Sequence, residues 1–156
     1  MWAFGISRCV RHNGANVTND SVAAVARACP KLTSINLAHN PRVTDAAVVA
    51  LAEHRPGLLS LNLAGAGAVA CIAARLGGLE HLDLHGTPAV ATTAWSPRAL
   101  ADGCPRLRYL HIGVPASSVP VSAVVAVLWQ WPPALRTFVA PNGPAGPTAA
   151  AAALAP

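Results

Sequence analysis

The sequence predicts an α/β fold in which short strand–turn–helix units repeat and stack beside one another. Three observations lead to this prediction: a leucine-anchored phrase recurs, apolar and polar residues alternate after each anchor, and helix-start signals stand between the copies. A unit of this size cannot bury an apolar face alone, so neighbouring units must stack and share one core. We therefore expect residues 1–156 to form a single domain.

The strands are predicted from the spacing around five anchor leucines. In the first copy, apolar residues stand three and five positions after the anchor, at Ile35 and Leu37, and the next three copies repeat this pattern. The fifth copy keeps Phe138 and weakens to Ala140. Because strand side chains alternate between two faces, each phrase predicts a short strand with its apolar residues facing inward. The anchors of these five predicted strands are Leu32, Leu58, Leu79, Leu107 and Leu135.

Helices are predicted where capping residues precede apolar spacing typical of a helix. Thr18 precedes SVAAVARAC, Thr44 with Asp45 precedes AAVVALAEH, and Ser96 precedes Pro97 and RALADGC. Ser and Thr accept hydrogen bonds from first-turn amides, and Pro is tolerated at the first helical position. We expect the inward faces of these helices to carry Val48, Leu51 and Leu100.

The composition limits the functional classes. Charged residues make up 11% of the chain and apolar residues 53%, which leaves few polar groups to cover a free-standing surface. We therefore expect a fragment of a longer array, either a monomer or part of a larger chain or complex. The formal charge of +5 is dispersed, with no basic run of the kind that follows a phosphate backbone, so no nucleic-acid partner is expected.

The cysteines and the apolar segments indicate the cellular compartment. Cys9, Cys29, Cys71 and Cys104 form no CxxC pair, and the N-terminal residues lack the apolar core of a signal peptide. A reducing, cytoplasmic or nuclear location is expected. The segment Ile112–Leu135 carries no formal charge, but its prolines and serines argue against a membrane span.

The stretch LTSINLAHNPRVTDAAVVALAEHRPGL, together with CPKL and CPRL, resembles the cysteine-containing leucine-rich repeats of F-box proteins. The resemblance extends from about Val17 to Phe138. It implies a leucine-rich-repeat solenoid, a curved right-handed stack with parallel strands on the concave face. It also implies a protein partner, and specifically a substrate of an SCF-type ubiquitin ligase.

Several residues depart from the pattern of that family. Arg55, Leu76 and Pro132 replace the terminal cysteine, and the asparagine of the turn, Asn40, is replaced in the other copies by Ala66, Thr87, Pro115 and Gly143. The region before Cys29 is predicted to hold a degenerate half repeat without an F-box, and the last unit is predicted to be incomplete after Asn142. A truncated array is the expectation.

The outward strand residues are the candidate partner-binding site, because partners of this family bind the concave face. The predicted face changes from small Ser and Asn side chains to His, Asp and Tyr along the array. The candidate residues are Ser34, Asn36, Ser60, Asn62, His81, Asp83, His85, Tyr109 and His111, followed by Thr137.

Asp83 and His111 provide an alternative, metal-dependent or hydrolytic reading. They occupy the same repeat position on neighbouring strands, and imidazole with carboxylate suits zinc. His81 and His85, however, would stand nearly 13 Å apart on one extended strand, by the strand rise of about 3.3 Å per residue. No activated nucleophile accompanies the pair. We therefore predict no enzyme activity, no metal and no cofactor, and regard the pair as a cross-strand contact.

Other side chains allow two readings each. Trp95, Trp129 and Trp131 could be exposed interface anchors or could fill gaps beside small alanines. The arginines at the predicted strand starts could recognise an acidic or phosphorylated peptide, or could protect the strand ends; they are Arg106, Arg108 and Arg136. The leading hypothesis is a protein-interaction module that serves a ligase, and the alternative is a scaffold with no ubiquitin link.

Overall fold

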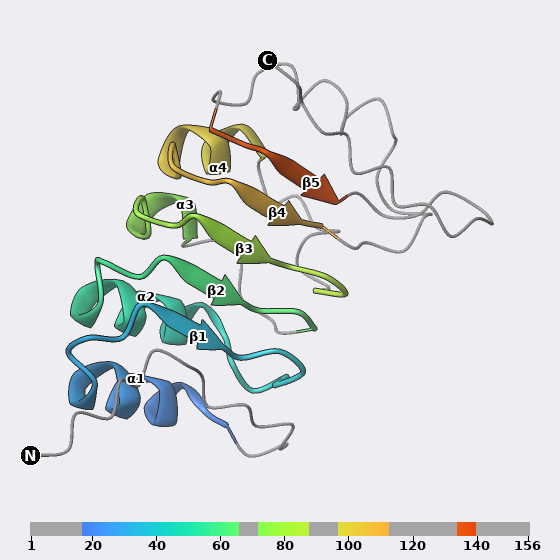
Figure 1. Ribbon diagram of the computed structural model, residues 1–156. Helices are drawn as coiled ribbons and strands as arrows, with labels where there is room; N and C mark the ends of the chain where they lie inside the picture. Colours follow the sequence, from blue (N-terminus) through green and yellow to red (C-terminus); the bar gives the residue numbers. More distant parts are fainter. Residues whose placement is uncertain (1–16, 66–71, 88–96, 113–133, 140–156) are drawn as a thin grey trace, which may run out of the picture.

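The computed structural model describes residues 17–65, 72–87, 97–112 and 134–139. Five strands of this region form one parallel sheet whose order follows the sequence: β1 (Ser34–Asn36), β2 (Ser60–Asn62), β3 (His81–Asp83), β4 (Tyr109–His111) and β5 (Thr137–Val139). The helices are α1 (Asn19–Ala28), α2 (Asp45–His54), α3 (Ile72–Arg75) and α4 (Pro97–Gly103). Figure 1 shows the strands stacked as a ladder with the helices along one side of it. The predicted α/β class and the parallel strands are confirmed.

The strand register follows the anchor leucines. The central residues of the strands stand opposite one another: Ile35 pairs with Leu61, Leu61 with Leu82, and Leu82 with Leu110. Although the spacings between anchors are unequal in the sequence, every paired strand keeps the same offset from its anchor. The differences in unit length therefore fall outside the sheet, where connections tolerate them.

The core lies between the sheet and the helices. All five anchors are buried, and so are the apolar residues at plus three and plus five in the first four copies. The helices complete the core with Val22 and Ala26 from α1 and with Val48 and Leu51 from α2. Leu100 supplies the same contact from α4, as its sequence position predicted.

Thr44 marks the start of α2, but its hydroxyl does not cap the helix. Asn19 of the neighbouring unit binds both sides of this residue: its Nδ2 donates to Thr44 Oγ1 at 2.8 Å, and its Oδ1 accepts from Thr44 N at 2.9 Å. Thr18, in contrast, accepts from Ser21 N at 3.4 Å and caps α1 as expected. Thr44 therefore links two units: its hydroxyl accepts from Asn19, at the start of α1, instead of from the first-turn amides of α2.

The turns after the strands are held by buried polar side chains. Asn40 Nδ2 donates to the carbonyl oxygens of Leu37 at 3.1 Å and Ala38 at 2.9 Å, within its own turn. At the equivalent position of the third copy, Thr87 Oγ1 donates to Leu63 O of the preceding unit at 2.8 Å. The replacement of asparagine by threonine thus keeps a buried hydrogen bond and redirects it between units.

The position three residues before the anchor, which carries cysteine in the first and fourth copies, contacts the preceding helix end in the second and fourth copies. Cys104 Sγ donates to Leu76 O at 3.5 Å. Arg55, at the same position of the second copy, donates from its guanidinium to Ala26 O at 2.5 Å, Pro30 O at 2.8 Å and Arg27 O at 3.4 Å. Because the last carbonyls of a helix lack intrahelical partners, either side chain can satisfy them. Cysteine is therefore replaceable here by another donor.

His39 occupies a left-handed turn position that two other copies fill with glycine. Its φ is 59°, beside 68° at Gly65 and 64° at Gly86. Because a side chain disfavours this conformation, we expect His39→Gly to raise the free energy of unfolding by about 0.5 kcal/mol, after the greater flexibility of unfolded glycine is included. Urea denaturation measures the change. The opposite substitution, Gly65→Ala, should destabilise, since its Cβ would lie 3.2 Å from His39 Nδ1. A destabilised His39→Gly variant would contradict the strain assigned to this turn.

Candidate functional site

The candidate site is the side of the sheet that faces away from the helices, here called the sheet face. It consists of the strand residues on either side of each buried central residue, and these side chains are half-buried or exposed. Its first half, on β1 and β2, carries only small uncharged polar groups. Its second half, from β3 onward, carries His, Tyr and Asp side chains. The sheet-face residues are Ser34, Asn36, Ser60, Asn62, His81, Asp83, Tyr109, His111 and Thr137.

A repeated side-chain turn ends three successive strands. Asn36 Oδ1 accepts from Ala38 N at 2.9 Å, Asn62 Oδ1 accepts from Ala64 N at 2.9 Å, and Asp83 Oδ1 accepts from His85 N at 3.0 Å. This is the Asx turn, in which Asn or Asp binds the backbone two residues later. The sequence interpretation missed this role, although Asn or Asp at the same position of three copies is its signal. One oxygen of each side chain is therefore already engaged by the chain itself.

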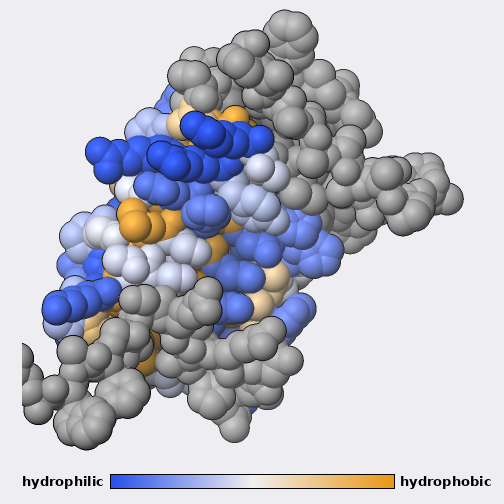
Figure 2. Space-filling model, viewed as in Figure 1, coloured by the Kyte–Doolittle hydropathy of each residue, from blue (hydrophilic) through white to orange (hydrophobic). Residues whose placement is uncertain are grey.

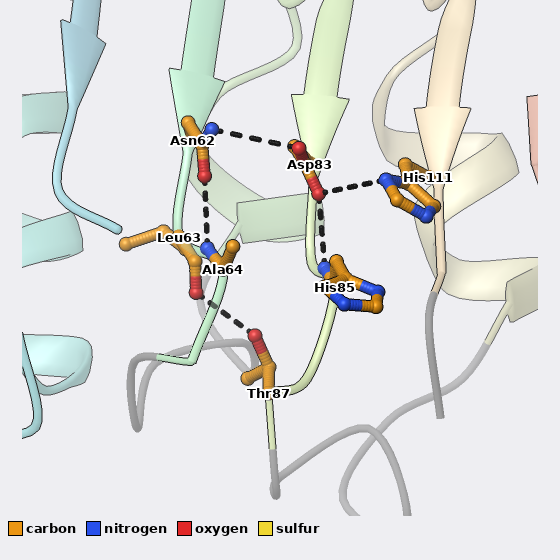
Figure 3. Close-up of polar contacts among 7 residues, drawn as sticks. All are labelled: Asn62, Leu63, Ala64, Asp83, His85, Thr87 and His111. Carbon is orange, nitrogen blue, oxygen red and sulfur yellow. Dashed lines mark hydrogen bonds and ion pairs between the residues drawn. The ribbon is translucent and has the colours of Figure 1, made fainter. Parts of the chain in front are cut away.

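Asp83 lies at the centre of a polar network that joins three units (Figure 3). His111 Nδ1 stands 3.2 Å from Asp83 Oδ1, and both side chains are about one-quarter exposed, at 24% and 26%. Asn62 Nδ2 donates to Asp83 Oδ2 at 3.5 Å from the other side. The predicted cross-strand contact of Asp83 and His111 is present. Because Asp83 also binds the turn of His85, the carboxylate holds an imidazole and a turn in place.

His85 lies in a different position from the one expected. It was placed on the same extended strand as His81 and Asp83, but β3 ends at Asp83 and His85 stands in the following turn. The Asx turn redirects the chain there. As a result the His85 ring stacks on His111, with ring centroids 4.9 Å apart and an interplanar angle of 19°. The 13 Å separation expected for a fully extended strand therefore does not apply.

A second stacked pair is formed by His81 of β3 and Tyr109 of β4, which stand opposite each other in the sheet. The rings of His81 and Tyr109 are 6.0 Å apart, with an interplanar angle of 27°. Burial raises the pKa of Tyr109 above its usual 10.0, and the negative charge of Asp83 raises it further. The phenol is therefore protonated at neutral pH and offers a hydrogen-bond donor beside the imidazole. Together the two stacked pairs form a broad, half-exposed aromatic and polar surface.

Arginine side chains line the edge at which β4 and β5 begin. Arg106, Arg108 and Arg136 are exposed, and Arg108 Nε stands 3.8 Å from Glu80 Oε2. Backbone hydrogen bonds place Glu80, Arg108 and Arg136 side by side at the starts of neighbouring strands. Arg108 N donates to Glu80 O at 2.8 Å, and Arg136 N donates to Arg108 O at 2.9 Å. Figure 2 shows the most hydrophilic colour gathered over this end of β4 and β5. Arg108 and Arg136 are therefore neighbours along one edge of the sheet, with Arg106 two residues before Arg108 in the sequence.

Leu59 of the second unit lies on the same edge, after Thr33 of the first unit, and the sequence interpretation missed it. Its carbonyl oxygen accepts from Glu80 N at 2.8 Å, so it precedes Glu80, Arg108 and Arg136 along the edge. Its side chain is 37% exposed, which makes it the exposed large apolar residue of the described region. Along this edge the residues are Thr33, Leu59, Glu80, Arg108 and Arg136, so it is basic only in the last two units.

Among the described residues, no group of three or more His, Cys, Asp and Glu side chains is placed to hold a metal ion. No described helix has the length and apolar character to cross a membrane. Three of the sequence interpretations lie outside the described residues: Trp95, Trp129 and Trp131, most of the uncharged segment from Ile112, and the incomplete unit after Asn142.

Cys104 is fully buried beneath the sheet, and burial raises the pKa of its thiol from 9.0 to about 11. The folded protein therefore retains this proton at a pH at which the unfolded chain releases it. We expect the free energy of unfolding to fall as the pH rises from 9.0 to about 11, with a slope from this thiol of at most about 1.4 kcal/mol per pH unit. Denaturant titrations of wild type and Cys104→Ala across this range measure the effect. Equal slopes in the two proteins would contradict it.

Known proteins provide a comparison at the level of structure. No family model matches the sequence, and no curated protein matches it significantly. The chain is similar to one in the crystal structure of the Rad7 and Elc1 complex in yeast, with 20% sequence identity and a TM-score of 0.54. The similarity covers 83% of this chain and 40% of that chain, so the protein spans about two-fifths of the length of its structural neighbour. At this identity the similarity shows a shared fold.

Proposed function

We propose that this protein is a non-enzymatic leucine-rich-repeat module that binds a protein partner on its sheet face. The observation that carries the proposal is the second half of that face, where His81 stacks on Tyr109 and His85 stacks on His111 around Asp83. Half-exposed aromatic rings with hydrogen-bonding tips are typical of residues that contribute most to protein interfaces.

The repeated architecture supports the leucine-rich-repeat assignment. Each described strand follows an anchor leucine at the same offset, the strands are parallel, and the central side chains of β1 to β4 form a continuous buried row. Stacked units of this kind present an extended surface made of the same position in successive strands. Here that surface is polar and carries the half-exposed side chains expected of a binding face.

We further propose that the bound partner is a substrate of an SCF-type ubiquitin ligase, in the cytoplasm or nucleus. The support is the similarity of the sequence between Leu32 and Leu58 to F-box leucine-rich repeats. The structural neighbour is itself part of a complex, that of Rad7 and Elc1, which is consistent with assembly into a larger complex. A scaffold without a ubiquitin link would have the same fold and the same sheet face, but its partner would not be degraded.

Proximity labelling in cells tests both levels of the proposal. The double variant His81→Ala/Tyr109→Ala should lose partners that wild type labels, because it removes one stacked pair without touching the core. The matched control Glu53→Ala/Arg75→Ala removes two exposed side chains from the helical side and should keep them. Equal labelling by all three proteins would refute binding at the sheet face. A lost partner whose cellular half-life is unchanged on depletion of the protein would indicate the scaffold instead.

A further inference from the structure

We infer that the second half of the sheet face, with its arginine edge, recognises an acidic segment of the protein partner. This inference rests on the proposed function and specifies the chemistry of the partner. It is drawn from the distribution of charge over the two halves of the surface. The residues that carry it are Arg106, Arg108, Arg136, His81, Tyr109 and His111.

The two halves of the surface differ in charge. The sheet-face positions of β1 and β2 hold only Ser and Asn, which carry no charge at any physiological pH. At the strand starts, Lys31 is the basic residue of the first unit, whereas Arg106, Arg108 and Arg136 stand at the starts of β4 and β5, with two acids, Glu80 and Asp83, on β3 and just before it. Both acids already have cationic or imidazole neighbours: Glu80 stands beside Arg108 and Asp83 beside His111. What differs between the halves is the row of residues directly after the anchors, which holds Thr33 and Leu59 in the first two units and the exposed guanidinium groups of Arg108 and Arg136 in the last two.

The geometry of the edge suits an extended acidic segment. The backbone hydrogen bond from Arg136 N to Arg108 O places these residues side by side at the starts of neighbouring strands, about 4.8 Å apart as adjacent strands are. Arg108 is 56% exposed, so most of its guanidinium is available despite Glu80. Guanidinium groups bind carboxylates in a planar, two-bond arrangement. A carboxylate at the arginine edge would leave the adjoining residues of the segment over the rings of Tyr109 and His81.

Fluorescence anisotropy with the full chain tests the inference. The probe is a labelled peptide of alternating Glu and Ser, and its uncharged counterpart replaces Glu with Gln. We expect the acidic peptide alone to bind, more weakly as salt is raised. Arg108→Gln/Arg136→Gln should weaken binding about fivefold, which corresponds to about 1 kcal/mol. Lys31→Gln/Arg42→Gln is the matched control, because it removes the same charge from exposed residues of the first half and should change affinity little.

The possible outcomes separate the inference from the proposed function. Equal weakening by the two double variants would show attraction to net charge alone and would overturn the inference. Tighter binding of a single-stranded DNA oligonucleotide than of the acidic peptide would also overturn it, since the edge would then fit nucleic acid better. If the acidic peptide fails to bind while the labelled partners still depend on His81 and Tyr109, the sheet face remains the binding surface and its partner is not acidic.

Discussion

Leu82→Asp is expected to unfold the protein. Leu82 is fully buried and stands in the central row of the sheet between Leu61 and Leu110. The substitution removes roughly 1.5–3 kcal/mol of side-chain burial and also places a carboxylate in the core without a partner. The second effect is the larger one, because an unpaired charge in an apolar interior costs several kcal/mol. Circular dichroism during thermal unfolding should show no cooperative transition at the wild-type temperature.

The neighbouring residue provides the control for this experiment. Asp83 lies on the opposite side of the strand, and Asp83→Asn retains the side-chain oxygen that accepts from His85 N. Asparagine already makes this turn at positions 36 and 62. We therefore expect Asp83→Asn to melt within a few degrees of wild type, because the partly exposed contact with His111 that it weakens is worth about 1 kcal/mol or less. If Leu82→Asp melts like Asp83→Asn, the strand register described above is wrong.

Gly103→Ala is expected to cause the second large loss of stability. Gly103 ends α4 where this helix lies against α3, and a Cβ atom there would overlap the carbonyl oxygen of Ala73 and lie 2.6 Å from its carbonyl carbon. Because the obstacle is backbone, no side-chain rotation relieves it. The helices must move apart, which costs about 3 kcal/mol as other overpacked sites do. Equilibrium urea denaturation measures the difference from wild type.

Gly57→Ala serves as the matched substitution, because a Cβ at Gly57 meets no atom within 4 Å. Its free energy of unfolding should stay within about 0.5 kcal/mol of wild type. The contrast between the two glycines separates close packing of α3 and α4 from a general effect of alanine. A Gly103→Ala protein as stable as Gly57→Ala would mean that the two helices are not packed as described.

The strands and their register could be predicted from the sequence because the leucine anchors repeat a physical requirement. Every unit must bury the same three positions, so Leu58, Leu61 and Leu63 are constrained together and reappear as equivalents in the other copies. The start of α1 also followed from its capping residue, Thr18. Apart from His85, the side chains expected on the sheet face lie there, since strand periodicity assigns them once the inward residues are known.

Other features could not be predicted, because they depend on contacts between units and on turn geometry. Arg55 substitutes for cysteine by reaching two carbonyl oxygens in the last turn of α1 and a third just beyond it, and no pattern within its own copy indicates this. Thr44 gives up its capping role to bind Asn19. The stacking of His85 on His111 depends on the turn made by Asp83, which redirects the chain after β3. The polar character of the face followed from the sequence, whereas the ring pairs required the structure.

Site-specific photocrosslinking tests the central claim, that the sheet face is the surface that binds a protein partner. A photoreactive phenylalanine analogue in place of Tyr109 keeps an aromatic ring on the face, and the same analogue in place of Glu53 stands exposed on α2. We expect the probe at position 109 to form a covalent adduct with a discrete cellular protein, and the probe at position 53 to form none with it. Adducts to the same protein from position 53, with none from position 109, would contradict the claim.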